Sequence, residues 1–388
     1  QDGYEKGAYI AASSKYRSFF KFTQNEEWNW PYNKNYMAWW DFETLPKLNY
    51  EDSPELEEYI LEIGRKWVSP PYNIDGWRMD VAADLGHSPE YNHSFWKKFR
   101  KVVKEANPNA IILAEHYGNP KAWLQGDEWD TVMNYDAFME PVTWFLTGME
   151  KHSDDYRGDL LGNADSFWGA MKHHSASFTM PSWQVAMNQL SNHDHSRFLT
   201  RTNHKVGRTN TLGPQAANEG INKGVFREAV VMQMTWVGAP TIYYGDEAGM
   251  CGFTDPDNRR AYPWGREDHD MIAFHRDIIR LRKEHDELRT GSIKYIDADY
   301  NYLAYARFHK EGQSVVLINN NDHEITKDLN VWEAGVPRES MMTRLIQTTQ
   351  DGYTQEGEKY PVHGGKIQVT LPAFSGTIVA AVREEEVK

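Results

Sequence analysis

Three acidic residues stand where predicted strands end. Asp80 closes the segment Gly-Trp-Arg-Met-Asp, Glu115 follows the apolar run at 110–114, and Asp194 follows a predicted strand at 185–191. In a parallel α/β barrel, the active site lies at the carboxyl ends of the strands. Any one of these acids could instead form a strand-end salt bridge or a helix cap. Three of them on strand–helix units of one region make that interpretation much weaker.

The surroundings of two of these acids predict different protonation states. Arg78 and Asp80 share one side of a strand because side chains alternate with period two, and a neighbouring guanidinium keeps a carboxylate ionised. Glu115 ends an apolar strand, where burial raises the pKa of a carboxyl group and suits a general acid. Two carboxylates with separated pKa values, about 5–5.5 Å apart, are the machinery of a retaining glycosidase. A third would stabilise an oxocarbenium-like state.

Other chemistry-bearing residues predict no metal or thiol chemistry. His173 and His174 are neighbours on a predicted helix, where adjacent side chains diverge. His193 and His195 are not interpreted as zinc ligands either. Cys251 is the single cysteine, which excludes an intrachain disulfide framework. We therefore predict no metal ligands.

Alternating strands and helices position the acids. Ser-Pro at 53–54 predicts one helix start, and the further helices are expected at 88–104, 158–177, 224–237 and 269–286. Strands are expected at 74–80, 110–115, 130–134, 185–191 and 240–244. This alternation predicts a parallel α/β fold.

The ends of the chain differ from this middle part. Residues 1–50 are irregular and rich in aromatic residues, whereas after 291 short strand patterns at 303–307, 314–318 and 376–380 replace the helical period. We predict three parts: an irregular segment at 1–50, an α/β region at 51–290 and an antiparallel β domain at 291–388.

The charge and the hydrophobic pattern of the chain argue against two classes of partner, nucleic acids and membranes. The 388 residues carry 42 Lys and Arg against 56 Asp and Glu, a formal net charge of −14. Nucleic-acid binding needs clustered cations, so no nucleic-acid partner is predicted. No apolar run approaches the ~20 residues of a membrane span, so no membrane partner is predicted either. The 15 Trp, 21 Tyr and 16 Phe indicate a sugar-binding surface or a large aromatic core.

The motifs around the three acids resemble those of the α-amylase family, glycoside hydrolase family 13. Residues 76–80 resemble its nucleophile region, 113–118 its acid/base region and 192–194 its third-carboxylate region. Residues 45–49, Leu-Pro-Lys-Leu-Asn, resemble a motif of the neopullulanase, cyclomaltodextrinase and amylopullulanase branch. Segments 238–247 and 255–260 also fit. His116 and Leu45 depart from the usual residues, which concerns subsite preference rather than reaction class.

The resemblance implies a (β/α)8 TIM barrel with a C-terminal antiparallel β-sandwich, and endo-acting, retaining hydrolysis of α-1,4-glucosidic bonds in starch and maltooligosaccharides. Asp80 would be the nucleophile, Glu115 the acid/base, and Asp194 a ligand of sugar hydroxyls. The substrate-binding residues would be Arg78, Asn192, His193, Tyr117, Asp255 and Arg259. Of these, Tyr117 could equally pack its own loop, and Asp255 and Arg259 could form a sugar clamp or a loop salt bridge.

Alternative functions stay open at this point. Neopullulanase, cyclomaltodextrinase or amylopullulanase specificity is one alternative, and a non-catalytic starch-binding fragment is another. All three acids are present, which favours catalysis. No cofactor is required by the implied chemistry, while structural calcium is compatible with the resemblance. A polymeric glucan substrate favours a secreted or cell-surface location.

The resemblance also implies an incomplete barrel. The Asp-x-x-x-Asn-His motif that ends the third strand of the family is not found before Asp80. Counting from the nucleophile, the strands present would be four to eight, and 1–50 resembles the loop domain after strand three. We expect a partner segment, once covalently joined, that carries strands one to three.

Overall fold

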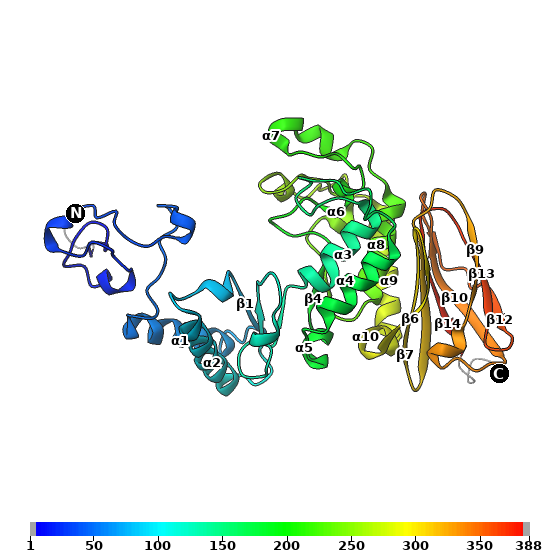
Figure 1. Ribbon diagram of the computed structural model, residues 1–388, viewed down its shortest axis with the longest axis horizontal. Helices are drawn as coiled ribbons and strands as arrows, with labels where there is room; N and C mark the ends of the chain where they lie inside the picture. The colour runs from blue at the N-terminus through cyan, green and yellow to red at the C-terminus, as the bar shows by residue number, and fades with distance from the viewer. Residues whose placement is uncertain (1–4, 383–388) are drawn as a thin grey trace. The chain divides into compact units, whose positions relative to one another are not determined.

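The computed structural model describes residues 5–382, and it divides into two compact units that are described one at a time (Figure 1). The first unit ends at Val132 and the second begins at Met133. This division falls inside the predicted α/β region. The predicted boundaries at 50/51 and 290/291 stay predictions.

Residues 5–50 of the first unit are irregular, in agreement with the prediction for this part of the chain. Three short 3-10 helices, η1 (Arg17–Phe19), η2 (Glu27–Asn29) and η3 (Trp39–Asp41), are joined by turns and isolated bridges. Phe20 pairs with Leu48 in one of these bridges. The segment is held mainly by such local pairings, because its many breakers prevent a continuous helix or strand.

Two amphipathic helices and three strands follow in this unit. Both α1 (Pro54–Val68) and α2 (Pro89–Ala106) begin with proline after serine, and the Ser88 hydroxyl accepts a hydrogen bond from the Tyr91 N–H. The helices approach closely, since a Cβ at Gly64 would lie 2.7 Å from the Phe99 ring. The strands β1 (Gly76–Met79), β2 (Ile111–Ala114) and β3 (Thr131–Val132) form a parallel sheet in that order.

The second unit begins with strands and helices in alternation. The strands β4 (Met187–Gln189) and β5 (Ala239–Thr241) are parallel neighbours, and Met133 forms a parallel bridge with Met187. The α-helices of this part are α3 (Glu140–Thr147), α4 (Ala164–Ser175), α5 (Met180–Gln184), α6 (Phe198–Arg201), α7 (Thr209–Leu212), α8 (Lys223–Thr235), α9 (His269–Glu284) and α10 (Asp286–Thr290). The π-helix η6 (Tyr135–Met139) leads into α3. All five predicted strands and the predicted helices are present within a few residues.

Short 3-10 helices lie between these elements within each unit. They are η4 (Ala82–Asp84), η5 (Lys121–Trp123), η7 (Pro214–Asn218), η8 (Asp246–Ala248), η9 (Asp257–Arg259) and η10 (Val331–Ala334).

An antiparallel β domain completes the second unit, as the sequence predicts. Its main sheet contains β6 (Ser292–Asp299), β7 (Tyr302–His309), β8 (Gly312–Asn319), β10 (Ser340–Thr348), β11 (Tyr353–Thr354), β12 (Lys359–Val362) and β14 (Ser375–Ala381). The order is β11-β10-β14-β8-β7-β6, with β12 also paired to β10. A second sheet consists of β9 (Ile325–Leu329) and β13 (Ile367–Leu371).

The two faces of the main sheet belong to two hydrophobic cores. Leu303 and Tyr305 of β7 join the core that contains α8, whereas Ala304 and Ala306 of the same strand join the core that contains β9 and β13. Side chains of a strand alternate between faces, so one strand serves both cores. The Tyr305 hydroxyl also lies 2.6 Å from Thr235 Oγ1 at the end of α8. This arrangement is a β-sandwich seated on helices.

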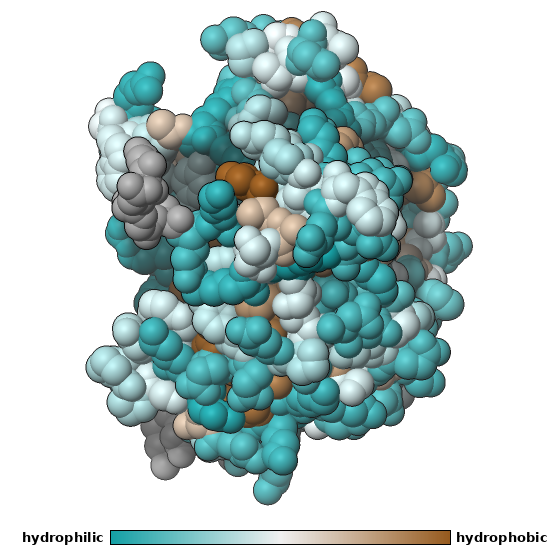
Figure 2. All heavy atoms as spheres, turned by 90° about the vertical axis from the view of Figure 1, so that its left-hand side faces the viewer, coloured by the Kyte–Doolittle hydropathy of each residue, from teal (hydrophilic) through white to brown (hydrophobic). Residues whose placement is uncertain are grey.

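The face drawn in Figure 2 is mostly polar. Hydrophilic residues cover most of the face in Figure 2, with a few hydrophobic patches between them. Among the residues that the structure describes, no helix is both long and apolar enough to cross a membrane.

Candidate functional site

Asp80 and Glu115 lie at the carboxyl ends of neighbouring parallel strands. The register of β1 and β2 pairs Met79 with Ala114, so the two acids are the next residues on each strand. The Glu115 N–H donates to the Met79 carbonyl at 2.8 Å. The strands come this close because residue 76 is glycine: its φ is +155°, and a Cβ there would lie 2.2 Å from the Ile111 carbonyl oxygen. The structure therefore brings together two of the three predicted acids.

Arg78 links the two carboxylates. Its Nη1 lies 2.6 Å from Asp80 Oδ1, and its Nη2 lies 3.6 Å from Glu115 Oε2. The Asp80 side chain is 74% exposed, whereas that of Glu115 is only 12% exposed. One acid is thus open to an incoming group and the other is shielded from water. The sequence predicted the Arg78–Asp80 contact and the burial of Glu115, but not the exposure of Asp80.

The pKa of the Glu115 carboxyl group is raised above its ordinary value. Burial is the main cause, and the neighbouring Asp80 carboxylate adds to it, because both disfavour a second negative charge. The backbone N–H of Val81 and the Arg78 guanidinium act in the opposite direction. Glu115 accordingly keeps its proton to higher pH than an exposed glutamate, as a general acid must.

Val81 is a site residue that the sequence analysis missed. Its N–H donates to Glu115 Oε2 at 2.9 Å, and its backbone is left-handed, with φ +46° and ψ +40°. A β-branched residue in this region is a true outlier, at a cost of roughly 1–3 kcal/mol. The strained turn after Asp80 aims the N–H at the acid. The residue type carries no signal for this, since valine normally avoids the conformation.

Replacing Arg78 by methionine should move the alkaline limb of the pH–activity profile to higher pH. Removing a cation that lies 3.6 Å from Glu115 Oε2 raises the pKa of that carboxyl group further. The measurement is kcat/KM against pH for Arg78→Met and for the control Arg65→Met, which removes an exposed arginine paired with Glu62. An unchanged or lowered alkaline limb in Arg78→Met would contradict the assigned role.

In the second unit, Asn192 shapes the loop that carries Asp194. Its buried side-chain oxygen accepts the N–H groups of Asp194 at 2.9 Å and His195 at 3.1 Å, which folds the chain back on itself. Asn258 donates from its amide to the carbonyls of Asn192 and His195 at 3.0 and 2.7 Å. Asn192 is therefore buried and positions the backbone of the Asp194 loop, so its side chain does not face a ligand.

Arg259 connects three of the predicted site residues. Its Nε lies 2.6 Å from Asp255 Oδ1 and donates to the His193 carbonyl at 3.1 Å, while its Nη2 lies 3.9 Å from Asp194 Oδ1. The Asp255 backbone is bound to the same loop, since its N–H donates to the Asp194 carbonyl at 3.3 Å. The Asp255–Arg259 ion pair, one of the two alternatives for these residues, is present, and their role as a sugar clamp stays a prediction. Both side chains are nearly half exposed, so a ligand can reach them.

A buried arginine, which the sequence analysis did not identify, contacts the segments that carry Asn258 and Asp246. Arg197 is fully buried and donates to the Tyr244 carbonyl at 2.8 Å, to Asp246 Oδ1 at 2.9 Å and to the Asn258 carbonyl at 3.0 Å. It also stacks over the Tyr243 ring. The segment 243–246 therefore serves as an anchor for the loop after β4.

His193 and Tyr117 are the remaining predicted site residues. His193 is partly exposed, with Nε2 at 3.6 Å from Asp194 Oδ1, and Tyr117 is an exposed tyrosine two residues after Glu115. Asp80 and Glu115 belong to the first unit and Asp194 to the second, so their convergence in one cleft stays a prediction. Within residues 5–382, no group of three or more His, Cys, Asp or Glu side chains is arranged to hold a metal ion.

Comparison with known proteins adds a family to this geometry. The model of the alpha-amylase catalytic domain matches residues 11–293. Neopullulanase 2 of Thermoactinomyces vulgaris is 34% identical over 341 residues, which cover 86% of this chain and 49% of that protein. A cyclomaltodextrinase of a Bacillus species is 35% identical over 281 residues, covering 72% of this chain and 44% of that protein. The chain spans about half the length of these curated relatives.

A solved structure extends the likeness to the fold. The debranching enzyme of Nostoc punctiforme is 27% identical, with a TM-score of 0.74 over 95% of this chain and 70% of that one. Together with the family match, this likeness confirms the predicted fold class, a (β/α)8 barrel with a C-terminal antiparallel β domain.

Proposed function

Because the chain belongs to the alpha-amylase catalytic-domain family, we propose that it carries the catalytic carboxylates of a retaining α-glucan hydrolase. The proposed reaction is endo-cleavage of α-1,4-glucosidic bonds in starch and maltooligosaccharides. The observation that carries the proposal is the Asp80–Arg78–Glu115 arrangement. It pairs an exposed carboxylate with a shielded carboxyl group of raised pKa at adjacent strand ends.

The proposed mechanism has two displacements. In the first, an Asp80 oxygen bonds to the anomeric carbon as the glycosidic C–O bond breaks, and Glu115 gives its proton to the departing oxygen. In the second, the Glu115 carboxylate takes a proton from water, whose oxygen displaces Asp80 from the sugar. Arg78 holds Asp80 in place through the 2.6 Å contact. Two inversions leave the anomeric configuration retained.

Asp194 supports the reaction by binding hydroxyl groups. Its loop is held by Asn192 and its carboxylate is flanked by Arg259 and His193. Charge-assisted hydrogen bonds from hydroxyls to such a carboxylate are strong and directional. We propose that Asp194 and His193 bind the sugar whose bond is broken and favour its distortion. These steps use protein side chains alone and require no cofactor.

The anomeric form of the first product tests this proposal. The protein is mixed with starch, and the newly formed reducing ends are followed by proton NMR before they equilibrate. Retention gives the α-anomer first. Initial formation of the β-anomer would overturn the assignment, and binding of starch without hydrolysis, when the segment that carries strands one to three is also supplied, would favour a non-catalytic starch-binding role.

Specificity for pullulan or cyclodextrin is a second candidate, favoured by the names of the relatives, which include a neopullulanase, a cyclomaltodextrinase and an amylopullulanase. Reducing-sugar release from starch, pullulan and cyclodextrin, compared at equal protein concentration, separates the candidates. A polymeric substrate would also place the protein outside the cell or on its surface.

Replacing Arg259 by alanine should weaken binding of maltotriose more than binding of maltose. Arg259 and Asp255 form a partly exposed pair beside Asp194, and such a pair can bracket the vicinal hydroxyls of a sugar beyond the reacting one. Inhibition constants of both sugars give the comparison, with Arg157→Ala as the control for an exposed arginine in an ion pair. Equal losses for both sugars would contradict the clamp.

A further inference from the structure

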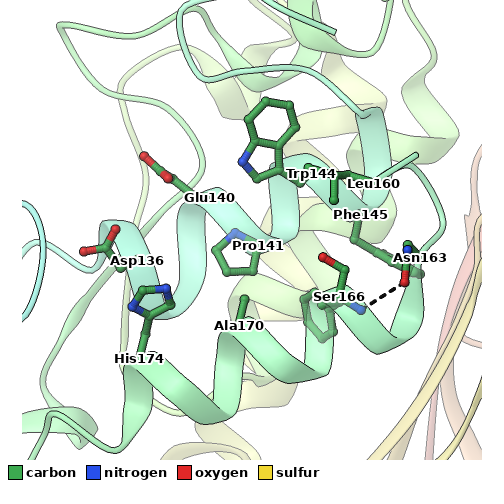
Figure 3. Close-up of a pocket in the computed structure, with 11 residues that line it drawn as sticks. Asp136, Glu140, Pro141, Trp144, Phe145, Leu160, Asn163, Ser166, Ala170 and His174 are labelled. Atoms are coloured by element: carbon green, nitrogen blue, oxygen red, sulfur yellow. Dashed lines mark hydrogen bonds between the residues drawn. The ribbon is translucent and has the colours of Figure 1, made fainter. Parts of the chain in front are cut away.

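A pocket lies between two helices of the second unit, apart from the residues assigned above. It is lined by η6, α3 and α4, together with Leu160 in the preceding turn, and has a volume of about 200 Å³ (Figure 3). The hollow forms where Pro141 of α3 faces Ala170 of α4, because neither side chain is long enough to fill the space between the helices. Phe145 and Phe167 are buried and close its base.

Polar groups stand at both ends of this pocket. Asp136, Glu140 and His174 gather at one end, and Asn163 and Ser166 at the other (Figure 3). The Asn163 side chain is held in place, since its oxygen accepts the Ser166 N–H at 2.9 Å and its amide donates to the Asp159 carbonyl at 3.1 Å. The Asn163 end of the pocket therefore has a fixed geometry.

An indole forms one wall. Trp144 is partly exposed on the α3 side, one helical turn after Glu140 (Figure 3). An aromatic wall with a few convergent polar groups is the usual composition of a small-molecule site. The C–H face of a hexose packs against an indole, and its hydroxyls pair with carboxylate, imidazole and amide groups.

The volume and the charge of the pocket indicate which class of ligand fits it. The volume is below the ~300–1,000 Å³ of drug-sized sites, so there is space for about one ring. A cation would be attracted by two carboxylates and an indole, but Lys151 already pairs with Glu140 at 2.5 Å and compensates part of that charge. A neutral, hydroxyl-rich ring suits the pocket better.

We propose that this pocket is a non-catalytic site for one glucose unit of an α-glucan chain. The ligand class rests on the proposed function, whereas the pocket itself does not. None of the residues that line it belongs to the candidate catalytic or substrate-binding groups. Binding there would retain a polymer chain on the protein without taking part in the reaction.

The test follows Trp144 directly. The protein is labelled with 5-fluorotryptophan in the Glu115→Gln background, so that maltotriose stays intact, and the Trp144 fluorine resonance is assigned with Trp144→Phe. Titration with maltotriose should shift this resonance with a dissociation constant on the order of 1 mM. The resonance of Trp332, an exposed indole of the β domain, should not move.

A matched pair of variants on α4 tests the hollow itself. Ala170→Leu fills the pocket and should reduce the maltotriose response of Trp144 at least tenfold. Gly169→Ala changes the neighbouring position, where a Cβ has no neighbour within 4 Å, and should leave the response unchanged. Circular dichroism shows whether the Ala170→Leu protein keeps its secondary structure. If it does not, this variant is replaced by Trp144→Ala, and the measurement is then the amount of starch that the protein retains.

Three outcomes would overturn the inference: no shift of the Trp144 resonance, a shift that Ala170→Leu leaves intact, or a shift with tetramethylammonium in place of maltotriose. Starch hydrolysis by the unaltered protein is measured separately. Hydrolysis without a Trp144 response contradicts only this inference, and a response without hydrolysis, when the segment that carries strands one to three is also supplied, contradicts only the proposed function.

Discussion

Replacing Glu115 by glutamine should slow starch hydrolysis by about 10²–10⁴-fold, the usual contribution of a positioned general acid. The amide retains the shape of the side chain but has no proton to give to the departing oxygen. A maltosyl fluoride substrate should lose much less in its first step, because fluoride leaves without protonation. The ratio of rates on the two substrates, measured for the variant and for the unaltered protein, checks the role.

Stability separates this effect from unfolding. The pKa of Glu115 is raised in the folded protein, so folding is favoured below the unfolded pKa of the carboxyl group and that contribution is lost as pH rises. Near neutral pH the glutamine, which cannot ionise, should therefore leave the melting temperature equal or higher. The control is Glu57→Gln, which alters a similarly buried glutamate that contacts Tyr91 and Lys98. Full activity of Glu115→Gln on starch would refute the assignment.

Replacing Asp80 by asparagine should have a still larger effect, of the order of 10⁴-fold or more, on both substrates. Asparagine cannot form the ester with the anomeric carbon, so a better leaving group gives no relief. The contrast with Glu115→Gln distinguishes the nucleophile from the acid. Initial rates on starch and on maltosyl fluoride provide the comparison, with Asp127→Asn as the control for an exposed aspartate in an ion pair.

A trapped intermediate gives this assignment a readout independent of rate. A maltosyl fluoride with a second, electron-withdrawing fluorine on the ring should react with the unaltered protein and accumulate as an ester. Mass spectrometry of the digested protein should then find the added sugar on the peptide that contains Asp80. Label on any other carboxylate, or turnover by Asp80→Asn at the unaltered rate, would contradict the mechanism.

Local sequence was sufficient to locate the strands and the acids that end them. The apolar run before Glu115 and the alternation of Arg78 and Asp80 depend only on neighbours along the chain, and both predictions agree with β1 and β2. The β domain was also foreseeable, because period-two patterns between turns replace the helical period after Gly291. These features are encoded in short windows.

Only the tertiary structure determines the burial and the hydrogen bonding of the site residues. The left-handed Val81, the buried Arg197 and the contact of Arg259 with Asp194 have no local signal. Each depends on residues far apart in the chain: 34 positions separate Val81 from its acceptor Glu115. Pattern and composition determine which segments form strands and which acids end them. Only folding determines which charges share a desolvated space, because burial and hydrogen bonding across distant segments are what shift a pKa and orient a side chain.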